Sequence, residues 1–181
     1  KQILERRINE MGLSEPLVQR EGARRIIIEL PGVKDPDEAI KRIGKTAVLE
    51  FKNDQGQTVM TGDDLKDAKE ELGQNKQPLV AIELSDEGAK KFADLTSKNI
   101  GRRIAITLDG KELTNPVVQQ AITGGKATIS GSQSLEEAKD LAILLRSGAL
   151  PVKINVLEVR TVGPSLGQDS KDKSVVAFSA G

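Results

Sequence analysis

The sequence predicts an α+β fold in which two distant stretches of chain form a base and the segment between them forms an inserted part. Three observations predict it: capping and stop signals that delimit amphipathic helices, short alternating strands between them, and a change of character after residue 52. With 181 residues the chain can form one large or two small domains.

The first third predicts a helix, a hairpin and a second helix. Apolar residues recur at helical spacing before Gly12, which can end the first helix. Strands rich in β-branched residues should follow at 17–21 and 24–30. Asp35 is the predicted N-cap of the next helix, and Gly44 its stop.

The rest of the chain alternates strands and helices. Asp109-Gly110, between two apolar runs, predicts a tight hairpin, and Ser134 predicts the start of the last helix. Pro116 marks its strand as an edge strand, which can take up an extended peptide by strand addition. In chain order the predicted elements are strand 46–52, turn 53–57, helix 63–73, strand 78–84, helix 85–101, strands 103–108 and 111–118, strand 126–131, helix 134–148 and strand 152–162.

This order predicts a discontinuous base. If residues 1–52 and 126–165 share one sheet with helices on one face, they form a ferredoxin-like sandwich that lacks its initial strand. Residues 53–125 then form an inserted α+β head subdomain. Residues 166–181 are predicted as a polar tail, and we interpret the chain as an excised soluble domain.

The composition excludes several classes of function. The chain has no His, Cys, Trp or Tyr and only three Phe. It therefore lacks the commonest general base, thiolate nucleophiles and the usual ligands of transition metals, and we expect no cofactor, metal or catalytic residue. Lys plus Arg and Asp plus Glu both number 27, with no basic stripe, so we expect no nucleic-acid partner.

One motif suggests an enzyme. Gly163-Pro164-Ser165-Leu166-Gly167 matches the G-x-S-x-G pattern of hydrolase nucleophile elbows. That chemistry requires a base beside the serine, and the chain has no histidine. We therefore interpret the motif as structural, and a serine hydrolase at Ser165 is the disfavoured alternative.

Four strings of sequence carry a family resemblance. They resemble SecD, or the SecD half of a fused SecDF, a family of membrane proteins that assist the Sec translocon. The strings are RRINEMGLSEPLVQREGARRIIIELPGV (6–33), IGKTAVLEF (43–51), DEGAKKFADLTSKNIGRRIAITLDG (86–110) and SGALPVKINVLEVRTVGPSLG (147–167).

The resemblance implies an extracytoplasmic domain of a membrane protein, between its first two transmembrane helices, with a ferredoxin-like base and a head that swings relative to it. It also implies that the polar tail at 166–181 leads toward a missing transmembrane helix. It implies unfolded preprotein as the ligand, and SecF and the SecYEG translocon as partners through the membrane part. Such a domain lies at the outer side of the bacterial cell membrane, captures emerging preprotein and helps export driven by the proton-motive force. The family's proton-coupling residues have no counterpart in this sequence.

Two expectations about function follow. The first is a non-enzymatic preprotein-binding domain whose residues of contact the sequence does not identify; the alternative is a ferredoxin-like small-ligand-binding regulatory domain. For the first, the head should rotate about residues where glycine or a turn can absorb backbone changes. These hinge candidates are Asn53, Asp54, Gly124 and Gly125.

Overall fold

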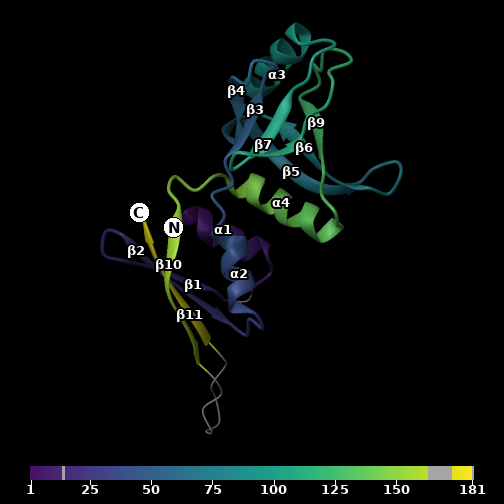
Figure 1. Ribbon diagram of the computed structural model, residues 1–181. Helices are drawn as coiled ribbons and strands as arrows, with labels where there is room; N and C mark the ends of the chain where they lie inside the picture. The colour runs from purple at the N-terminus through teal and green to yellow at the C-terminus, as the bar shows by residue number, and fades with distance from the viewer. Residues whose placement is uncertain (14, 163–172, 181) are drawn as a thin grey trace. The chain divides into compact units, whose positions relative to one another are not determined.

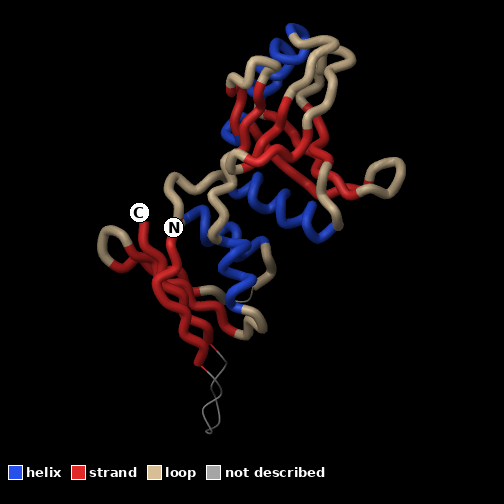
Figure 2. Tube along the Cα trace, in the orientation of Figure 1, coloured by secondary structure: helices blue, strands red, loops and turns tan. Residues whose placement is uncertain are grey.

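The structure, a computed structural model, describes residues 1–13, 15–162 and 173–180. The chain divides into two compact units. Unit 1 comprises Lys1–Thr46 and Leu150–Gly181, and unit 2 comprises Ala47–Ala149. Both contain helices and strands, as Figures 1 and 2 show, which confirms the predicted α+β class.

Unit 1 packs two helices against one face of a four-stranded antiparallel sheet (Figure 1). The sheet order is β1-β2-β11-β10, and in β2 the buried Ile28 and Leu30 face the helices. Leu4 and Ile8 of α1 and Ile40 of α2 complete the core. The elements are α1 (Gln2–Glu10), β1 (Leu17–Glu21), β2 (Arg25–Pro31), α2 (Pro36–Ile43), β10 (Ile154–Val162) and β11 (Lys173–Ala180).

A buried arginine binds the backbone at the end of Lys1–Thr46, the first of the two segments of unit 1. Arg7 of α1 is fully buried, and its guanidinium donates to the carbonyl of Ile43 at 2.7 Å and to that of Thr46 at 3.4 Å. It also donates to the carbonyl of Lys45. These bonds satisfy carbonyls at and just beyond the C-terminus of α2, where the helix itself offers no donors. The chain therefore leaves unit 1 from a fixed position.

Unit 2 contains two sheets, ordered β4-β3-β7-β8 and β5-β6-β9, with all pairs antiparallel. Helix α4 packs along β5 and β6, and α3 packs against β4 and β6. The elements are β3 (Leu49–Lys52), β4 (Thr58–Thr61), η1 (Gly62–Asp64), β5 (Leu65–Leu72), β6 (Pro78–Leu84), α3 (Asp86–Lys98), β7 (Ala105–Leu108), β8 (Lys111–Thr114), β9 (Lys126–Ser130) and α4 (Leu135–Ser147).

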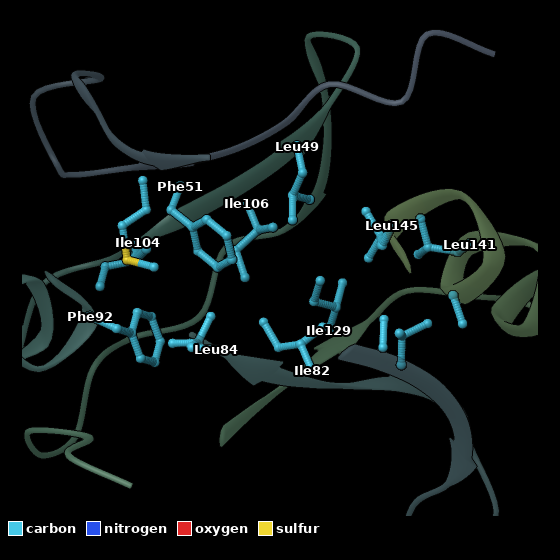
Figure 3. Close-up of a cluster of buried hydrophobic side chains, with 14 of the residues drawn as sticks. Leu49, Phe51, Ile82, Leu84, Phe92, Ile104, Ile106, Ile129, Leu141 and Leu145 are labelled. Carbon is cyan, nitrogen blue, oxygen red and sulfur yellow. The ribbon is translucent and has the colours of Figure 1, made fainter. Parts of the chain in front are cut away.

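The core of unit 2 joins both sheets and both helices (Figure 3). Phe51 of β3 and Phe92 of α3 meet edge to face, with ring centroids 5.9 Å apart. From the other sheet, Ile82 and Ile129 enter the same cluster, and Leu141 of α4 packs on it. One continuous apolar cluster therefore makes unit 2 a domain with its own core.

The local signals at helix ends and turns are confirmed. The Oδ1 of Asp35 accepts from the N–H of Glu38 at 2.9 Å, and the Oγ of Ser134 accepts from the N–H of Glu137 at 3.1 Å. Asp109 and Gly110 both have positive φ, 49° and 78°, in the two-residue turn between β7 and β8. That is the backbone geometry of the predicted hairpin.

The predicted helix at 63–73 is wrong. Residues 65–72 form β5, which pairs with β6 along its length and is preceded by the short η1 turn. The residues are good helix formers, but Ala68 is buried and its carbonyl accepts from Arg146 of α4. Pairing and burial outweigh a propensity of a few tenths of a kcal/mol per residue.

The predicted boundary between base and head is also wrong. The strand predicted at 46–52 contains β3, which pairs with β4 and β7 of unit 2. The strand predicted at 126–131 contains β9, which pairs with β6 of unit 2. Helix α4 packs on β5 and β6 rather than on the base. The stretches 47–52 and 126–149 therefore belong to unit 2, because patterns within a strand do not determine which strand it pairs with.

Part of the tail predicted at 166–181 is a strand. Residues 173–180 form β11, which pairs with β2 and β10, while 163–172 and 181 lie outside the described residues. The ferredoxin-like arrangement of the base stays a prediction. Within the described ranges, no helix combines the length and the apolar character that crossing a membrane requires.

Candidate functional site

Unit 2 contains a cavity of about 700 Å³, within the range of pockets that bind small molecules or side chains. We call it the unit 2 cavity. It lies where β9, an edge strand of its sheet, faces α3, β7 and the loop after β8. Its lining residues are Asp67, Ala68, Lys69, Glu71, Ala81, Ile82, Glu83, Phe92, Thr96, Ile104, Ile106, Pro116, Val118, Ile122, Lys126, Ala127 and Thr128.

The inner wall of the unit 2 cavity is apolar. Phe92, Ile104 and Ile106 are buried members of the unit 2 core, and Ile122 packs against that core while remaining partly exposed. Apolar surface that is open to solvent gains free energy when another apolar group covers it, at about 25 cal/mol per Å². The wall can therefore bind aliphatic or aromatic side chains without selecting a particular one.

A buried threonine fixes the loop that forms one side of the cavity. The Oγ1 of Thr96 donates to the carbonyl of Phe92 at 2.8 Å and accepts from the backbone N–H of Ile122 at 2.9 Å. Thr96 is fully buried, so this hydrogen bond to the loop is protected from water. Ile122 is thereby held against the cavity by a residue of α3.

Charged residues at the cavity are paired on the outer face of the β5-β6-β9 sheet. Glu83 accepts from Lys66 at 2.6 Å, and this hydrogen bond lowers the pKa of Glu83 and raises that of Lys66. Asp67 lies 3.3 Å from the Nζ of Lys69. Burial raises the pKa of Asp67, but hydrogen bonds from the Ala68 N–H and from Lys69 outweigh it and leave the pKa lowered. The carboxylates are thus ionised at neutral pH.

None of the four hinge candidates connects the units, because all lie inside unit 2. Asn53 caps the β3–β4 turn, where its Oδ1 accepts from the N–H groups of Gln55 and Gln57. Asp54 accepts from Arg102 at 2.9 Å. Gly124 and Gly125 precede β9, and the carbonyl of Gly125 accepts from the N–H of Leu84 at 2.8 Å.

The chain crosses between the units at two other places, Thr46–Ala47 and Ala149–Leu150. The backbone N–H of Leu150 donates to the carbonyl of Thr46 at 2.8 Å, so the two crossings lie side by side. On the unit 2 side, the carboxylate of Asp109 accepts from the N–H groups of Ala47 and Val48 at 3.0 and 2.9 Å. Gly44 and Gly148, which end the helices before these positions, predicted helix stops but not connections between units.

The other sequence expectations have separate outcomes. Ser165 and its G-x-S-x-G motif lie outside the described residues. Within the described ranges, no group of three acidic side chains is placed to hold a metal ion. No sequence pattern predicted the apolar wall, because its residues come from three separate segments, at 92, 104–106 and 122.

Two family models match the chain. The model described as the SecDF P1 head subdomain matches residues 39–152, and that of the N-terminal part of the P1 domain of protein translocase subunit SecDF matches residues 1–56. The first match contains the whole of unit 2 and therefore the unit 2 cavity.

Curated relatives are named protein translocase subunits SecD or SecDF. Protein translocase subunit SecD of Acidaminococcus fermentans is 61% identical over 180 residues, which cover 99% of this chain and 43% of the relative. Protein translocase subunit SecDF of Thermus thermophilus is 43% identical over 206 residues, which cover 93% of this chain and 28% of the relative. The chain thus spans less than half the length of these relatives.

Solved structures agree with these matches. A crystal structure of SecDF in a super-membrane-facing form superposes with a TM-score of 0.85 at 42% identity, covering 93% of this chain and 28% of that one. A structure of SecDF, described as a membrane component that enhances protein export, gives 0.82 at 41% identity, covering 89% of this chain and 90% of that one. The chain belongs to the SecD/SecDF family of protein translocase subunits and corresponds to its P1 region.

Proposed function

We propose that this P1 region is an extracytoplasmic, non-enzymatic domain that binds unfolded preprotein in the unit 2 cavity during export through the Sec translocon. The observation that carries the proposal is an open apolar wall inside the part of the chain that matches the P1 head subdomain. Translocase subunits handle polypeptides of many sequences, and an apolar wall with paired charges outside it suits such a ligand.

Binding should be weak and tolerant of sequence. Three of the polar groups in the cavity lining are already engaged and cannot readily select one side chain: Glu83 is paired with Lys66, Asp67 with Lys69, and Thr96 accepts from the backbone of Ile122. A translocase must also release each segment that it binds. The mainly apolar lining favours polypeptide side chains over the polar effector that a small-ligand regulatory domain would hold.

The proposal includes movement of unit 2 relative to unit 1. Because the chain passes between the units at Thr46–Ala47 and Ala149–Leu150, a change of backbone dihedrals at these adjacent crossings can turn one unit against the other. In the longer protein, this movement would alternate capture and release, coupled to the proton-motive force through the membrane part and its partners SecF and SecYEG.

Titration of the 181-residue chain with a reduced, carboxymethylated and therefore permanently unfolded polypeptide tests the binding. A dissociation constant weaker than about 10 µM is expected. Ile122→Asp should weaken binding at least tenfold, because it places a carboxylate in the apolar wall. Leu72→Asp is the matched control, since Leu72 is 56% exposed and lies outside the lining. Absence of binding at millimolar concentration, or equal loss in both variants, contradicts the proposal.

The movement can be measured separately, because the chain has no native cysteine. Exposed Lys41 in unit 1 and exposed Lys111 in unit 2 can be replaced by cysteine and spin-labelled. Electron–electron distance measurements between these two labels should give a distance distribution that is broader than motion of the labels alone would produce. Two cysteines placed within unit 2, Lys90→Cys and Lys111→Cys, supply the control width. A distribution between units as narrow as this control contradicts the movement.

A further inference from the structure

The edge of β9 that faces away from β6 has unpaired backbone groups. β9 pairs with β6 only, and the N–H of Leu84 donates to the carbonyl of Gly125 in the same register. In an antiparallel pair, hydrogen-bonded positions alternate, so Ala127 and Ile129 point their backbone groups toward β6. Lys126, Thr128 and Ser130 therefore point theirs outward, and no described residue forms a backbone hydrogen bond with them there.

This free edge borders the unit 2 cavity over only part of its length. Residues 126–128 line the cavity. Farther along, β8 approaches β9: the hydroxyls of Thr114 and Ser130 are 3.2 Å apart. A Cβ at Gly131 would lie 2.6 Å from the carbonyl oxygen of Leu113. The space beside β9 is thus closed at the Gly131 end and open beside Lys126 and Thr128.

From this geometry we infer that the unit 2 cavity takes its ligand as an added β-strand, paired antiparallel with β9. The inference rests on the proposed function and names how the polypeptide is held. Alternating donors and acceptors along an edge are complementary to an extended peptide backbone, which every polypeptide carries whatever its side chains. Backbone pairing thus explains how one site accepts many sequences.

The side chains of the added strand divide between two surfaces. Residues that hydrogen-bond to β9 lie opposite Lys126 or Thr128 and share their face, where charges of both signs are present. The alternate residues share the face of Ala127, which packs against the unit 2 core, and they meet the apolar wall. The preferred segment therefore alternates apolar and polar residues.

Backbone methylation tests this inference directly. The probe is a peptide of alternating Val and Thr with terminal lysines, bound to the 181-residue chain. In the predicted mode the Thr N–H groups face β9. N-methylation of three Thr residues should weaken binding at least about tenfold, because each methyl removes a donor and blocks the edge. N-methylation of three Val residues adds the same groups on the opposite edge and should change affinity less than about threefold.

Amide exchange locates the added strand. Bound peptide should slow exchange of the Lys126 and Thr128 amides at least about fivefold, and leave the Ala127 and Ile129 amides, already bonded to β6, unchanged. A protein variant tests the inference independently. Thr128→Pro removes an N–H that points outward, and an edge strand tolerates proline at such a position, whereas Thr128→Ala keeps the N–H. Only the proline variant should lose binding.

The outcomes separate the two proposals. If no peptide binds in any form, the proposed function fails. If both methylated peptides bind equally and the amides of β9 are not protected, the proposed function stands and strand addition at β9 is overturned. Protection that appears instead at residues 111–114 would overturn it as well, because the peptide would then pair with the edge of β8.

Discussion

The N–H of Leu150 donates to the carbonyl of Thr46 at a distance of 2.8 Å, although the two residues are far apart in the sequence (150 − 46 = 104). Between these two residues lies the whole of unit 2. The bond brings together the two places where the chain crosses between units, so any movement there involves two adjacent strands of backbone rather than two distant linkers. Rotation about adjacent crossings need not disturb either core.

Asp109 controls the first crossing from the unit 2 side. Its carboxylate accepts from the N–H groups of Ala47 and Val48, and Ala47 has a positive φ of 59°. Asp109→Ala leaves these donors without their acceptor and places alanine at a positive φ, which together should lower the free energy of unfolding of unit 2 by about 1–3 kcal/mol. Amide exchange at residues 47 and 48 should accelerate on the order of 5–30-fold, as measured by NMR.

The control for this variant is Asp94→Ala. Asp94 forms an exposed pair with Lys98 one helical turn away, which contributes less than about 0.5 kcal/mol. Unchanged exchange at residues 47 and 48 in Asp109→Ala would show that the carboxylate does not hold the crossing.

Features that depend on neighbouring residues could be predicted from the sequence. The N-caps at Asp35 and Ser134 and the Asp109-Gly110 turn each involve a few consecutive residues, and all three are present. Their energies are local, because a side chain bonds the backbone three residues away or a turn requires positive φ. The α+β class follows from these signals together with the spacing of apolar residues.

Features that depend on pairing could not be predicted in this way. The sequence of β9 reads as a strand in either unit, and only its pairing with β6 assigns it to unit 2. Residues 65–72 have helical propensity, yet the hairpin with β6 and the covering helix α4 make them a strand. The unit 2 cavity likewise arises where separate segments diverge, which no single segment encodes.

Arg7 should be essential to the stability of unit 1. Replacing it with Met keeps much of the apolar stem but leaves the carbonyls of Ile43, Lys45 and Thr46 without their buried donor. We expect the free energy of unfolding of unit 1 to fall by about 3 kcal/mol. Amide exchange in β2, a strand of the unit 1 sheet, reports this loss separately from unit 2. Arg6→Met is the control, because Arg6 is exposed; equal effects of the two substitutions would contradict the role of Arg7.

Gly88 permits the close approach of α3 to η1. A Cβ at this position would lie 2.3 Å from the carbonyl oxygen of Asp64, so backbone must move. Gly88→Ala should therefore destabilise unit 2 by about 1–3 kcal/mol, although alanine is the better helix former. Chemical denaturation monitored by amide signals of unit 2 measures the loss. Gly124→Ala, where no atom lies within 4 Å of the added Cβ, should change stability by less than about 1 kcal/mol. A neutral Gly88→Ala would refute the packing argument.

Acid should destabilise unit 2 through carboxylates whose pKa values are lowered in the fold. The pKa of Glu50 lies below its ordinary value of 4.5, first because the Thr58 hydroxyl donates to it at 2.8 Å and then because of Lys52. The native state thus binds a proton less readily than the unfolded chain. The stabilisation is complete above pH 4.5 and disappears as the pH falls through the lower folded pKa.

The free energy of unfolding of unit 2 should accordingly decrease with pH below 4.5, and Glu50→Gln should make that decrease shallower. Thr58→Val should act in the same direction, because it removes the donor that contributes most to the lowered pKa. Urea denaturation at a series of pH values between about 2.5 and 6 measures the slope. A Glu50→Gln chain with the same pH dependence as the unsubstituted chain would show that Glu50 does not contribute, and the acid sensitivity would then be assigned to Glu83 and Asp67, whose pKa values are also lowered.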